Sequence, residues 1–363
     1  MDDLKTAHEL GRLLKASIQV EASDIHIKPG SVPMFRISGE LLPVEFPAVE
    51  TEQLQEFCTH ISGRSDTELS GVRSLEFTYE WPGVARFRGH YYIHRGGPAL
   101  ALRPIPLEIP TMKDLRLPAA SKRICELTHG LVLVTGATGM GKSTTLACLL
   151  ESIAHTSCSH IITIEDPVEF AIKPGSSSVG QREVGRDVDG YDEGLRQALR
   201  QDPDVIMIGE IRDRPTMEVA LHAAQSGHLV LSTAHFNDTT STVNGVVAMA
   251  EPAEQRNWRF RLADSLRAII SQRLLRRSGS PGRVLATELL FNGPTIRACI
   301  QDENKTKSIQ TGLERGRTEF MTHSMDQSLL ELVEAKLINV ETAQGAAASP
   351  GDLMREINLR RLV

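Results

Sequence analysis

The sequence predicts an α/β protein of two domains, in which an α+β module precedes a larger domain of alternating strands and helices. Its 363 residues are too many for one ordinary domain and comfortable for two. Within residues 1–105, strand-like segments alternate in polarity. From about residue 114, short apolar strands are separated by helical segments, which indicates a sheet buried on both faces.

The first module, residues 1–105, begins with leucines at the spacing of a short helix. Alternating segments follow and predict strands, because a strand directs successive side chains to opposite faces. These segments lie at 24–27, 34–37, 85–93 and 100–103. Pro104, Pro106 and Pro110 then cluster where neither a strand nor a helix can continue, so we predict an interdomain linker at 106–113.

The second domain, residues 114–363, begins with strands that are separated by helical segments. Four short apolar runs predict the buried strands, at 131–134, 161–164, 205–208 and 229–232. The part from residue 254 onwards is predicted to be mainly helical. A capping box at Ser324–Gln327 and a proline after Ser349 each indicate the start of a helix there.

Composition and charge argue against several classes of protein. The formal net charge is −6, so the chain lacks the basic footprint expected of a protein that mainly binds duplex nucleic acid. The five cysteines form no C-x-x-C pair, which argues against a structural zinc site and favours a reducing compartment. No apolar run approaches the ~18 residues of a membrane span, and no signal peptide is recognisable, so we expect a protein that neither spans a bilayer nor is exported.

Residues 136–143 read G-A-T-G-M-G-K-S and match the phosphate-binding pattern G-x-x-x-x-G-K-[ST]. Glycines let the backbone turn its N–H groups towards phosphate oxygens, and the helix that follows adds the positive end of its dipole. Lys142 can reach the β and γ phosphates, and the Ser143 hydroxyl can bind Mg²⁺. We therefore predict a site for ATP and Mg²⁺ formed by Gly136, Ala137, Thr138, Gly139, Met140, Gly141, Lys142, Ser143 and Thr144.

Two glutamates follow predicted strands and are candidates for the chemistry. Glu210 comes after the apolar run 205–208, which is the Walker-B arrangement, so its carboxylate can orient or polarise an attacking water. Glu165 follows the run 161–164 and can hold Mg²⁺ through water or orient the nucleophile. On spacing alone, a surface loop at Glu210 and a solvated turn at Glu165 remain open alternatives.

Histidines and arginines give weaker patterns. His228 and His235 lie at either end of one predicted strand, where a γ-phosphate sensor and a purely structural role are both open interpretations. Arg86 and Arg88 are two residues apart and share one face of a strand. Paired arginines can contact phosphates across a subunit boundary, although an ordinary solvated face is the alternative.

Taken in order, these motifs resemble those of the PilT family of type IV pilus retraction ATPases, within the wider class of secretion ATPases. Glu165–Phe170 resembles the Asp box of that family and Gly227–His235 resembles its His box. This likeness supports catalytic roles for Glu165, His228 and His235. The other matching segments are Ser23–His26, Ala85–Arg88, Gly136–Thr144, Asp202–Ile206 and Gly209–Asp213.

The resemblance implies a PAS-like N-terminal domain, a RecA-like ATPase domain with a helical C-terminal part, and a homo-hexameric ring. It also implies that ATP binds between the two domains and that Arg86, Arg88 and Arg103 reach the nucleotide. The expected location is the cytoplasmic face of the inner membrane, with membrane attachment only through partners. Those partners would be an inner-membrane pilus platform protein and a paired assembly or retraction ATPase, with no nucleic acid.

One motif departs from the family. The family sequence Ala-Ile-Arg-Asn-Leu-Ile stands here as Thr295-Ile296-Arg297-Ala298-Cys299-Ile300. Because that motif is tied to retraction and not to ATP binding, hydrolysis is still expected, whereas the work that it drives stays open. The alternatives are a standard retraction motor, an accessory paralogue, and the ATPase of a related type II or type IV secretion system. The modest length and the lack of a cysteine-rich zinc insertion favour the retraction branch.

Two other classes of function compete with a motor. A nucleotide-gated ring adaptor would bind ATP with negligible turnover, but Ser143, Glu165 and Glu210 are all present and favour an enzyme. A nucleic-acid translocase would need a basic surface, and only the segment Arg273–Arg277 provides one within an acidic chain. The sequence therefore predicts a Mg-dependent ATPase, and the resemblance implies that it works as a hexameric motor.

Overall fold

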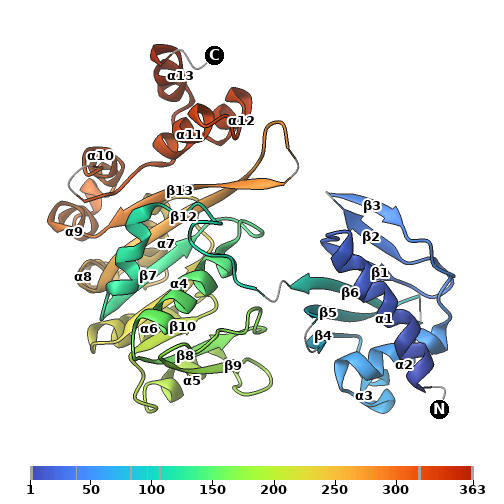
Figure 1. Ribbon diagram of the computed structural model, residues 1–363. Helices are drawn as coiled ribbons and strands as arrows, with labels where there is room; N and C mark the ends of the chain where they lie inside the picture. Colours follow the sequence, from blue (N-terminus) through green and yellow to red (C-terminus); the bar gives the residue numbers. More distant parts are fainter. Residues whose placement is uncertain are drawn as a thin grey trace. The chain divides into compact units, whose positions relative to one another are not determined.

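The computed structural model describes residues 3–37, 39–81, 84–95, 97–105, 108–280, 282–317 and 320–360. The chain forms two compact units, each with its own sheet (Figure 1). The first unit comprises Met1–Glu108 and Pro167–Ala171, and the second comprises Ile109–Asp166 and Ile172–Val363. The division after Glu108 falls within the predicted linker, of which residues 106 and 107 lie outside the described part of the chain.

The described elements of the first unit are α1 (Asp3–Gln19), β1 (Asp24–Ile27), β2 (Met34–Ile37), β3 (Glu40–Pro43), α2 (Thr51–Ser62), α3 (Asp66–Ser70), β4 (Ser74–Trp81), β5 (Ala85–His94) and β6 (Gly97–Ile105). The six strands form an antiparallel sheet in the order β3-β2-β1-β6-β5-β4. Its core combines leucines of α1 with Phe57 of α2 and with Phe87 and Tyr91 of β5. The sequence did not predict β3, because every residue of this edge strand is exposed and no alternation results.

The second unit begins with the 3₁₀ helix η1 (Ala119–Glu126) and contains a seven-stranded sheet in the order β13-β12-β7-β11-β10-β8-β9. All neighbouring pairs are parallel except β12 with β13. Helices cover both faces (Figure 1), so β7, β10 and β11 are buried along their whole length. The strands are β7 (Gly130–Thr135), β8 (His160–Glu165), β9 (Ser178–Glu183), β10 (Val205–Ile208), β11 (Leu229–Ala234), β12 (Leu266–Arg276) and β13 (Arg283–Phe291).

The four apolar runs predicted as strands in this unit are confirmed as β7, β8, β10 and β11. The prediction of a mainly helical segment from residue 254 is wrong for β12 and β13. These two strands form a long antiparallel hairpin whose aliphatic residues, including Ile269 and Leu290, are buried at the sheet edge. Apolar runs that are buried on both faces lack a strand periodicity, so the sequence alone could not distinguish them from buried helix.

Helices connect and cover these strands, and several begin where the sequence indicated. The capping box at Ser324 and Gln327 is present at the start of α11, and α13 begins at Pro350. No helix in the described residues is long and apolar enough to cross a membrane. The helices are α4 (Lys142–Thr156), α5 (Tyr191–Ala198), α6 (Arg214–Gln225), α7 (Thr239–Ala248), α8 (Gln255–Ser265), α9 (Pro294–Gln301), η2 (Glu303–Lys305), α10 (Ser308–Arg315), α11 (Met325–Glu334), α12 (Val340–Ala346) and α13 (Pro350–Leu359).

Glu288 on β13 joins two of these helices at their first residues. Its side chain is 1% exposed and accepts hydrogen bonds from the backbone N–H of Thr239 at 2.7 Å and of Met325 at 3.4 Å. Burial raises the pKa of this carboxyl, and the bond from Thr239 opposes that shift. The first turns of α7 and α11 therefore share one buried acceptor.

Candidate active site

The carboxyl ends of four adjacent parallel strands carry most of the predicted site. In the sheet these strands lie in the order β7, β11, β10 and β8. The phosphate loop follows β7, His235 follows β11, and Glu210 comes after β10. The fourth strand, β8, ends at Glu165. Because the strands are parallel and in register, their carboxyl ends meet at one edge of the sheet. Such an edge is where open α/β sheets bind ligands.

The phosphate loop has the backbone that its sequence requires. Gly136, Gly139 and Gly141 have φ values of 146°, 78° and 82°, a region that side chains disfavour. A Cβ atom at position 136 would also lie 2.6 Å from the carbonyl oxygen of Gln272, so only glycine fits there. Gly141 then caps α4, whose first residue is Lys142.

The amine of Lys142 lies at the loop and is 8% exposed as a residue. Its Nζ donates hydrogen bonds to the carbonyl oxygens of Gly136 at 2.9 Å and Ala137 at 3.0 Å. Burial lowers the pKa of Lys142, and the negative charge of Glu210 counteracts this shift. The charges of Lys142 and Glu210 therefore interact. The amine and the predicted Walker-B carboxylate lie at the same edge of the sheet.

Ser143 is exposed in the first turn of α4, and its hydroxyl makes no hydrogen bond with the described residues. A nucleotide therefore fits the loop: glycine backbone, a lysine amine and a serine hydroxyl converge there. The described residues contain no group of three or more His, Cys, Asp or Glu side chains able to hold a metal ion. Mg²⁺ would accordingly depend on Ser143, water and nucleotide phosphates, which is a usual set of ligands for this ion.

Glu210 is held in a fixed orientation, and its side chain is 14% exposed. Its Oε2 lies 3.0 Å from Nε2 of His235, and its Oε1 forms an ion pair with Arg212. The Tyr191 hydroxyl lies next to Gly209, the residue that precedes Glu210. A Cβ atom built on Gly209 would be 3.1 Å from this hydroxyl. Burial, together with the charge of Glu210, raises the pKa of Tyr191.

Glu165 is buried at the end of β8, where its residue exposure is 7%. Its Oε1 accepts hydrogen bonds from the Thr163 hydroxyl at 2.6 Å and from Nε2 of Gln181 at 2.9 Å. Thr163 belongs to the same strand, and Gln181 lies on the neighbouring β9. Two donors on adjacent strands thus position this carboxylate, which is not the solvated turn that spacing alone left open.

His228 does not join the other predicted residues at the carboxyl edge of the sheet. It precedes β11, which runs parallel to β7, so it lies at the amino edge of the sheet, opposite to the phosphate loop. Its Nδ1 lies 3.1 Å from both the carbonyl oxygen of Ala223 and the hydroxyl of Ser226. Its carbonyl oxygen also accepts a hydrogen bond from Gly130 N–H. His228 therefore links the end of α6 to the start of β11.

The three predicted arginines lie in the first unit, where each faces an acidic residue. Arg86 lies 3.8 Å from Glu80, and Arg88 lies 2.8 Å from Glu76 on the neighbouring strand. Arg103 pairs with Asp24 at 2.8 Å; although burial opposes the shift, this contact lowers the pKa of Asp24. Arg88 also lies 3.8 Å from Glu169, in the segment that groups with the first unit.

Sequence reasoning missed the residues that brace the phosphate loop from the hairpin of β12 and β13. Gln272 is 0% exposed, and its Nε2 donates to the carbonyl oxygen of Met140 at 2.7 Å. The backbone N–H of Leu274 contacts the Met140 sulfur at 3.2 Å, and Nη1 of Arg283 donates to the Gly139 carbonyl at 3.3 Å. No spacing in the sequence connects these residues to a loop more than 130 positions away.

Comparison with known proteins identifies relatives along nearly the whole chain. The family model described as "Type II/IV secretion system protein" matches residues 111–359. The chain is 38% identical over 343 residues to the type IV pilus retractation ATPase PilT of Pseudomonas aeruginosa, covering 94% of this chain and 99% of that protein. It is 37% identical to the twitching motility protein of Neisseria gonorrhoeae, covering 94% and 91% respectively.

Among solved structures, the crystal structure of the pilus retraction motor PilT with bound ADP is similar. The TM-score is 0.87 with 40% sequence identity, and the match covers 95% of this chain and 98% of that one.

Proposed function

Because the chain belongs to the Type II/IV secretion system protein family, we propose that it is an ATPase motor that retracts type IV pili. The single observation that carries this proposal is the fixing of Glu210 between His235 and Arg212, at the sheet edge where the phosphate loop begins. An acid positioned in this way is needed for hydrolysis and not for nucleotide binding alone. The relatives named as pilus retraction proteins support the same activity.

ATP would bind to residues 136–144, with Lys142 at the β and γ phosphates. The amine would exchange its two carbonyl acceptors, Gly136 and Ala137, for phosphate oxygens, which form stronger charge-assisted bonds. Mg²⁺, when bound through Ser143, supplies charge stabilisation for the phosphates. The solved relative with ADP supports nucleotide binding, and the magnesium ion is our proposal.

Glu210 would accept a hydrogen bond from the attacking water and orient it towards the γ phosphate. His235 and Arg212 hold the carboxylate, so little reorganisation is required when the water is activated. Glu165 would orient water or the magnesium shell from the adjoining region, because Thr163 and Gln181 fix its direction. The proposed catalytic set is therefore Glu210, Glu165 and His235, without His228.

The assembly is also a proposal. We infer a homo-hexamer in which the first unit is a PAS-like domain, the second is RecA-like, and Arg86, Arg88 and Arg103 reach a nucleotide across a subunit boundary. The ion pairs that Arg86, Arg88 and Arg103 form with acidic side chains support this role, since an ion pair can be exchanged for a phosphate. The partners would be an inner-membrane platform protein and a paired pilus ATPase at the cytoplasmic face.

An accessory paralogue is the second candidate, and one observation favours it. The segment Thr295–Ile300 forms α9 and differs from the family motif at three of its six positions. Its retained Arg297 forms an ion pair with Asp264 on α8. ATP hydrolysis is common to both candidates, whereas the work performed on a pilus differs.

Steady-state phosphate release with Mg-ATP tests the proposed enzyme. We expect wild-type protein to turn over ATP, Lys142→Ala to lose nucleotide binding, and Glu210→Gln to bind ATP while losing about 10²–10⁴-fold in rate. Glu218→Gln, on the exposed side of α6, is the matched control and should behave as wild type. Turnover by Glu210→Gln that approaches the control would rule out the assigned role.

A further inference from the structure

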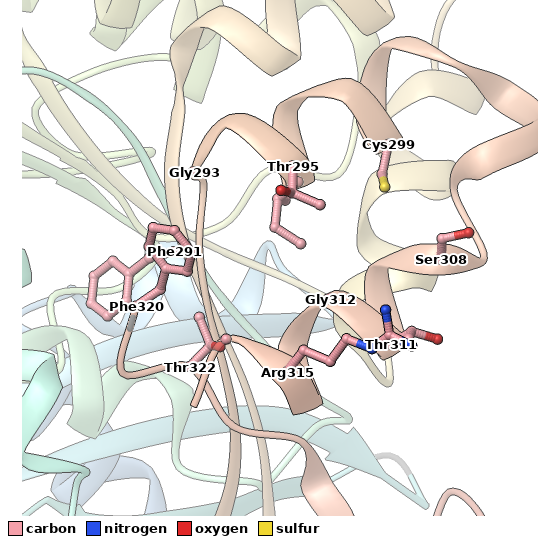
Figure 2. A pocket seen from close by; sticks show the side chains of 12 residues that line it. Phe291, Gly293, Thr295, Cys299, Ser308, Thr311, Gly312, Arg315, Phe320 and Thr322 are labelled. Carbon is pink, nitrogen blue, oxygen red and sulfur yellow. The ribbon is translucent and has the colours of Figure 1, made fainter. Parts of the chain in front are cut away.

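A cavity lies between α9 and α10 (Figure 2). Its volume is about 480 Å³, and no phosphate-loop residue or predicted catalytic residue lines it. Small-molecule sites in proteins usually have volumes of about 300–1,000 Å³ and combine an apolar lining with a few convergent polar groups. The cavity has this size and both kinds of lining.

The floor of the cavity is apolar and rigid. Phe291, Ile296 and Cys299 are 7%, 6% and 6% exposed. Arg123 supports the Phe291 wall from outside, with its guanidinium 4.4 Å from the ring centroid. The same arginine donates a hydrogen bond to the Phe320 carbonyl at 3.0 Å, so both aromatic residues of the wall are held by one cation.

The rim is polar and carries one cation. Thr295, Ser308 and Thr311 are exposed lining residues, and Figure 2 shows α9 and α10 presenting their side chains from opposite sides. Arg315 lies at the end of α10, and its guanidinium makes no ion pair or hydrogen bond with the described residues. Arg317, two positions later, pairs with Glu331. Among these two neighbouring cations, only Arg315 lines the cavity.

Two small residues, Cys299 on α9 and Gly312 on α10, line the cavity between these helices. A Cβ atom on Gly312 would lie 2.8 Å from Cδ1 of Ile296, so glycine permits the contact between α9 and α10. The thiol of Cys299 occupies less of the space than a leucine side chain would. Burial raises the pKa of the Cys299 thiol, which therefore presents a neutral surface.

We propose that this cavity binds a small organic anion. Its apolar ring or chain would lie against Phe291, Ile296 and Cys299, and its carboxylate or phosphate would pair with Arg315. The rim hydroxyls of Ser308 and Thr311 are further donors for the same anionic group. The proposal does not rest on ATP hydrolysis, because the site shares no residue with the phosphate loop.

Ligand-observed NMR titrations of the full chain test the proposal, with benzoate and phenyl phosphate as the anionic probes and benzyl alcohol as the neutral one. We expect at least one anion to bind more tightly than benzyl alcohol, and the comparison of benzoate with phenyl phosphate shows which anionic group the site prefers. Arg315→Gln should weaken the anion at least about tenfold, because a charge-assisted bond is lost. Cys299→Leu should abolish binding by filling the cavity.

Arg317→Gln is the matched control and should bind the probes within about twofold of wild type, because its side chain does not line the cavity. ATP turnover, measured for every variant, reports that the fold is intact. The proposal is overturned if neither anion binds wild type at millimolar concentration. It is equally overturned if Arg315→Gln binds both anions as wild type does.

Discussion

His235 and Glu210 come from different strands, yet Nε2 of the imidazole lies 3.0 Å from Oε2 of the carboxylate. The neighbouring position of β10 and β11 in the sheet causes this contact, because the two residues follow the carboxyl ends of paired strands. His235 remains 42% exposed in its side chain, so it is accessible from the nucleotide edge while it holds Glu210. The contact therefore links the histidine that follows β11 directly to the predicted Walker-B carboxylate that follows β10.

Replacement of His235 by alanine should reduce ATP turnover by about 10- to 100-fold, because Glu210 loses one of its two positioning partners. Nucleotide affinity should change little, since among the described residues the side chain of His235 is hydrogen-bonded to Glu210 and not to the phosphate loop. Single-turnover hydrolysis and equilibrium binding of ATP separate these effects. His222→Ala, an exposed histidine in the last turn of α6, is the control. Equal losses in both variants would show that the contact with Glu210 is not the cause.

Gln272→Leu should weaken ATP binding by about tenfold, because the phosphate loop loses the donor to the Met140 carbonyl while side-chain volume is kept. Turnover at saturating ATP should stay close to wild type, since the proposed catalytic carboxylates Glu165 and Glu210 are untouched. Steady-state kinetics would show this as a higher KM with an unchanged kcat. Gln255→Leu removes a similar amide donor at the start of α8 and is the control. An unchanged KM in Gln272→Leu would contradict the bracing role.

Gly245→Ala should displace Phe236, because a Cβ atom at position 245 would lie 1.9 Å from the Phe236 ring. Overpacking of this kind costs about 1–3 kcal/mol of stability. The displacement should also disturb the adjacent His235 and lower turnover. Thermal unfolding and phosphate release measure the two effects.

The double variant Gly245→Ala, Phe236→Leu provides the check, because a smaller side chain makes room for the added methyl group. Stability should recover in part relative to Gly245→Ala alone. Gly351→Ala, where nothing lies within 4 Å of the added carbon, is the control and should not lose stability. A double variant that is less stable than the single one would show that Phe236 is not the obstacle.

His323 should make the second unit less stable in acid. Burial lowers its pKa from 6.5 to about 4, while hydrogen bonding to Thr287 opposes this shift. The contribution is complete above pH 6.5 and is lost as pH falls towards 4, because the unfolded chain gains the proton first. The free energy of unfolding should therefore decrease by about 2–3 kcal/mol across this window from His323 alone.

Urea unfolding at pH 7 and pH 5, followed by the fluorescence of the buried Trp258 in a Trp81→Phe background, measures this dependence. His323→Gln should show a smaller decrease between the two pH values than the parent. An identical decrease in both proteins would exclude His323 as the source.

The sequence was most informative where local constraints define the structure. The phosphate loop could be predicted because three glycines with positive φ and a following lysine leave few alternatives. Glu165, Glu210 and His235 could be predicted because acids and histidines after buried strands are brought to one edge by parallel pairing. His228 and His235 belong to the same sequence motif, but they lie at the two ends of β11. They are therefore at opposite edges of the sheet, which the motif alone does not indicate.

Contacts between residues far apart in the sequence could not be predicted from such local patterns. Gln272 on β12 and Arg283 on β13 reach the loop because β12 pairs with both β7 and β13, whereas the sequence predicts helix for this part of the chain. Gln181 orients Glu165 from β9, a strand whose polar sequence gave no buried pattern. The cavity at Arg315 similarly depends on the approach of α9 to α10 at Gly312, which a single glycine in the sequence does not reveal.

The shared carboxyl of Glu288 has a mechanical consequence. The helix that follows His235 and the helix that opens the C-terminal group both begin on this side chain. If α7 shifted alone, a buried acceptor would lose its strongest donor, whereas a concerted shift of α7, β13 and α11 preserves every bond. A shift of α7 that keeps both hydrogen bonds would therefore move Glu288 and the first turn of α11 with it.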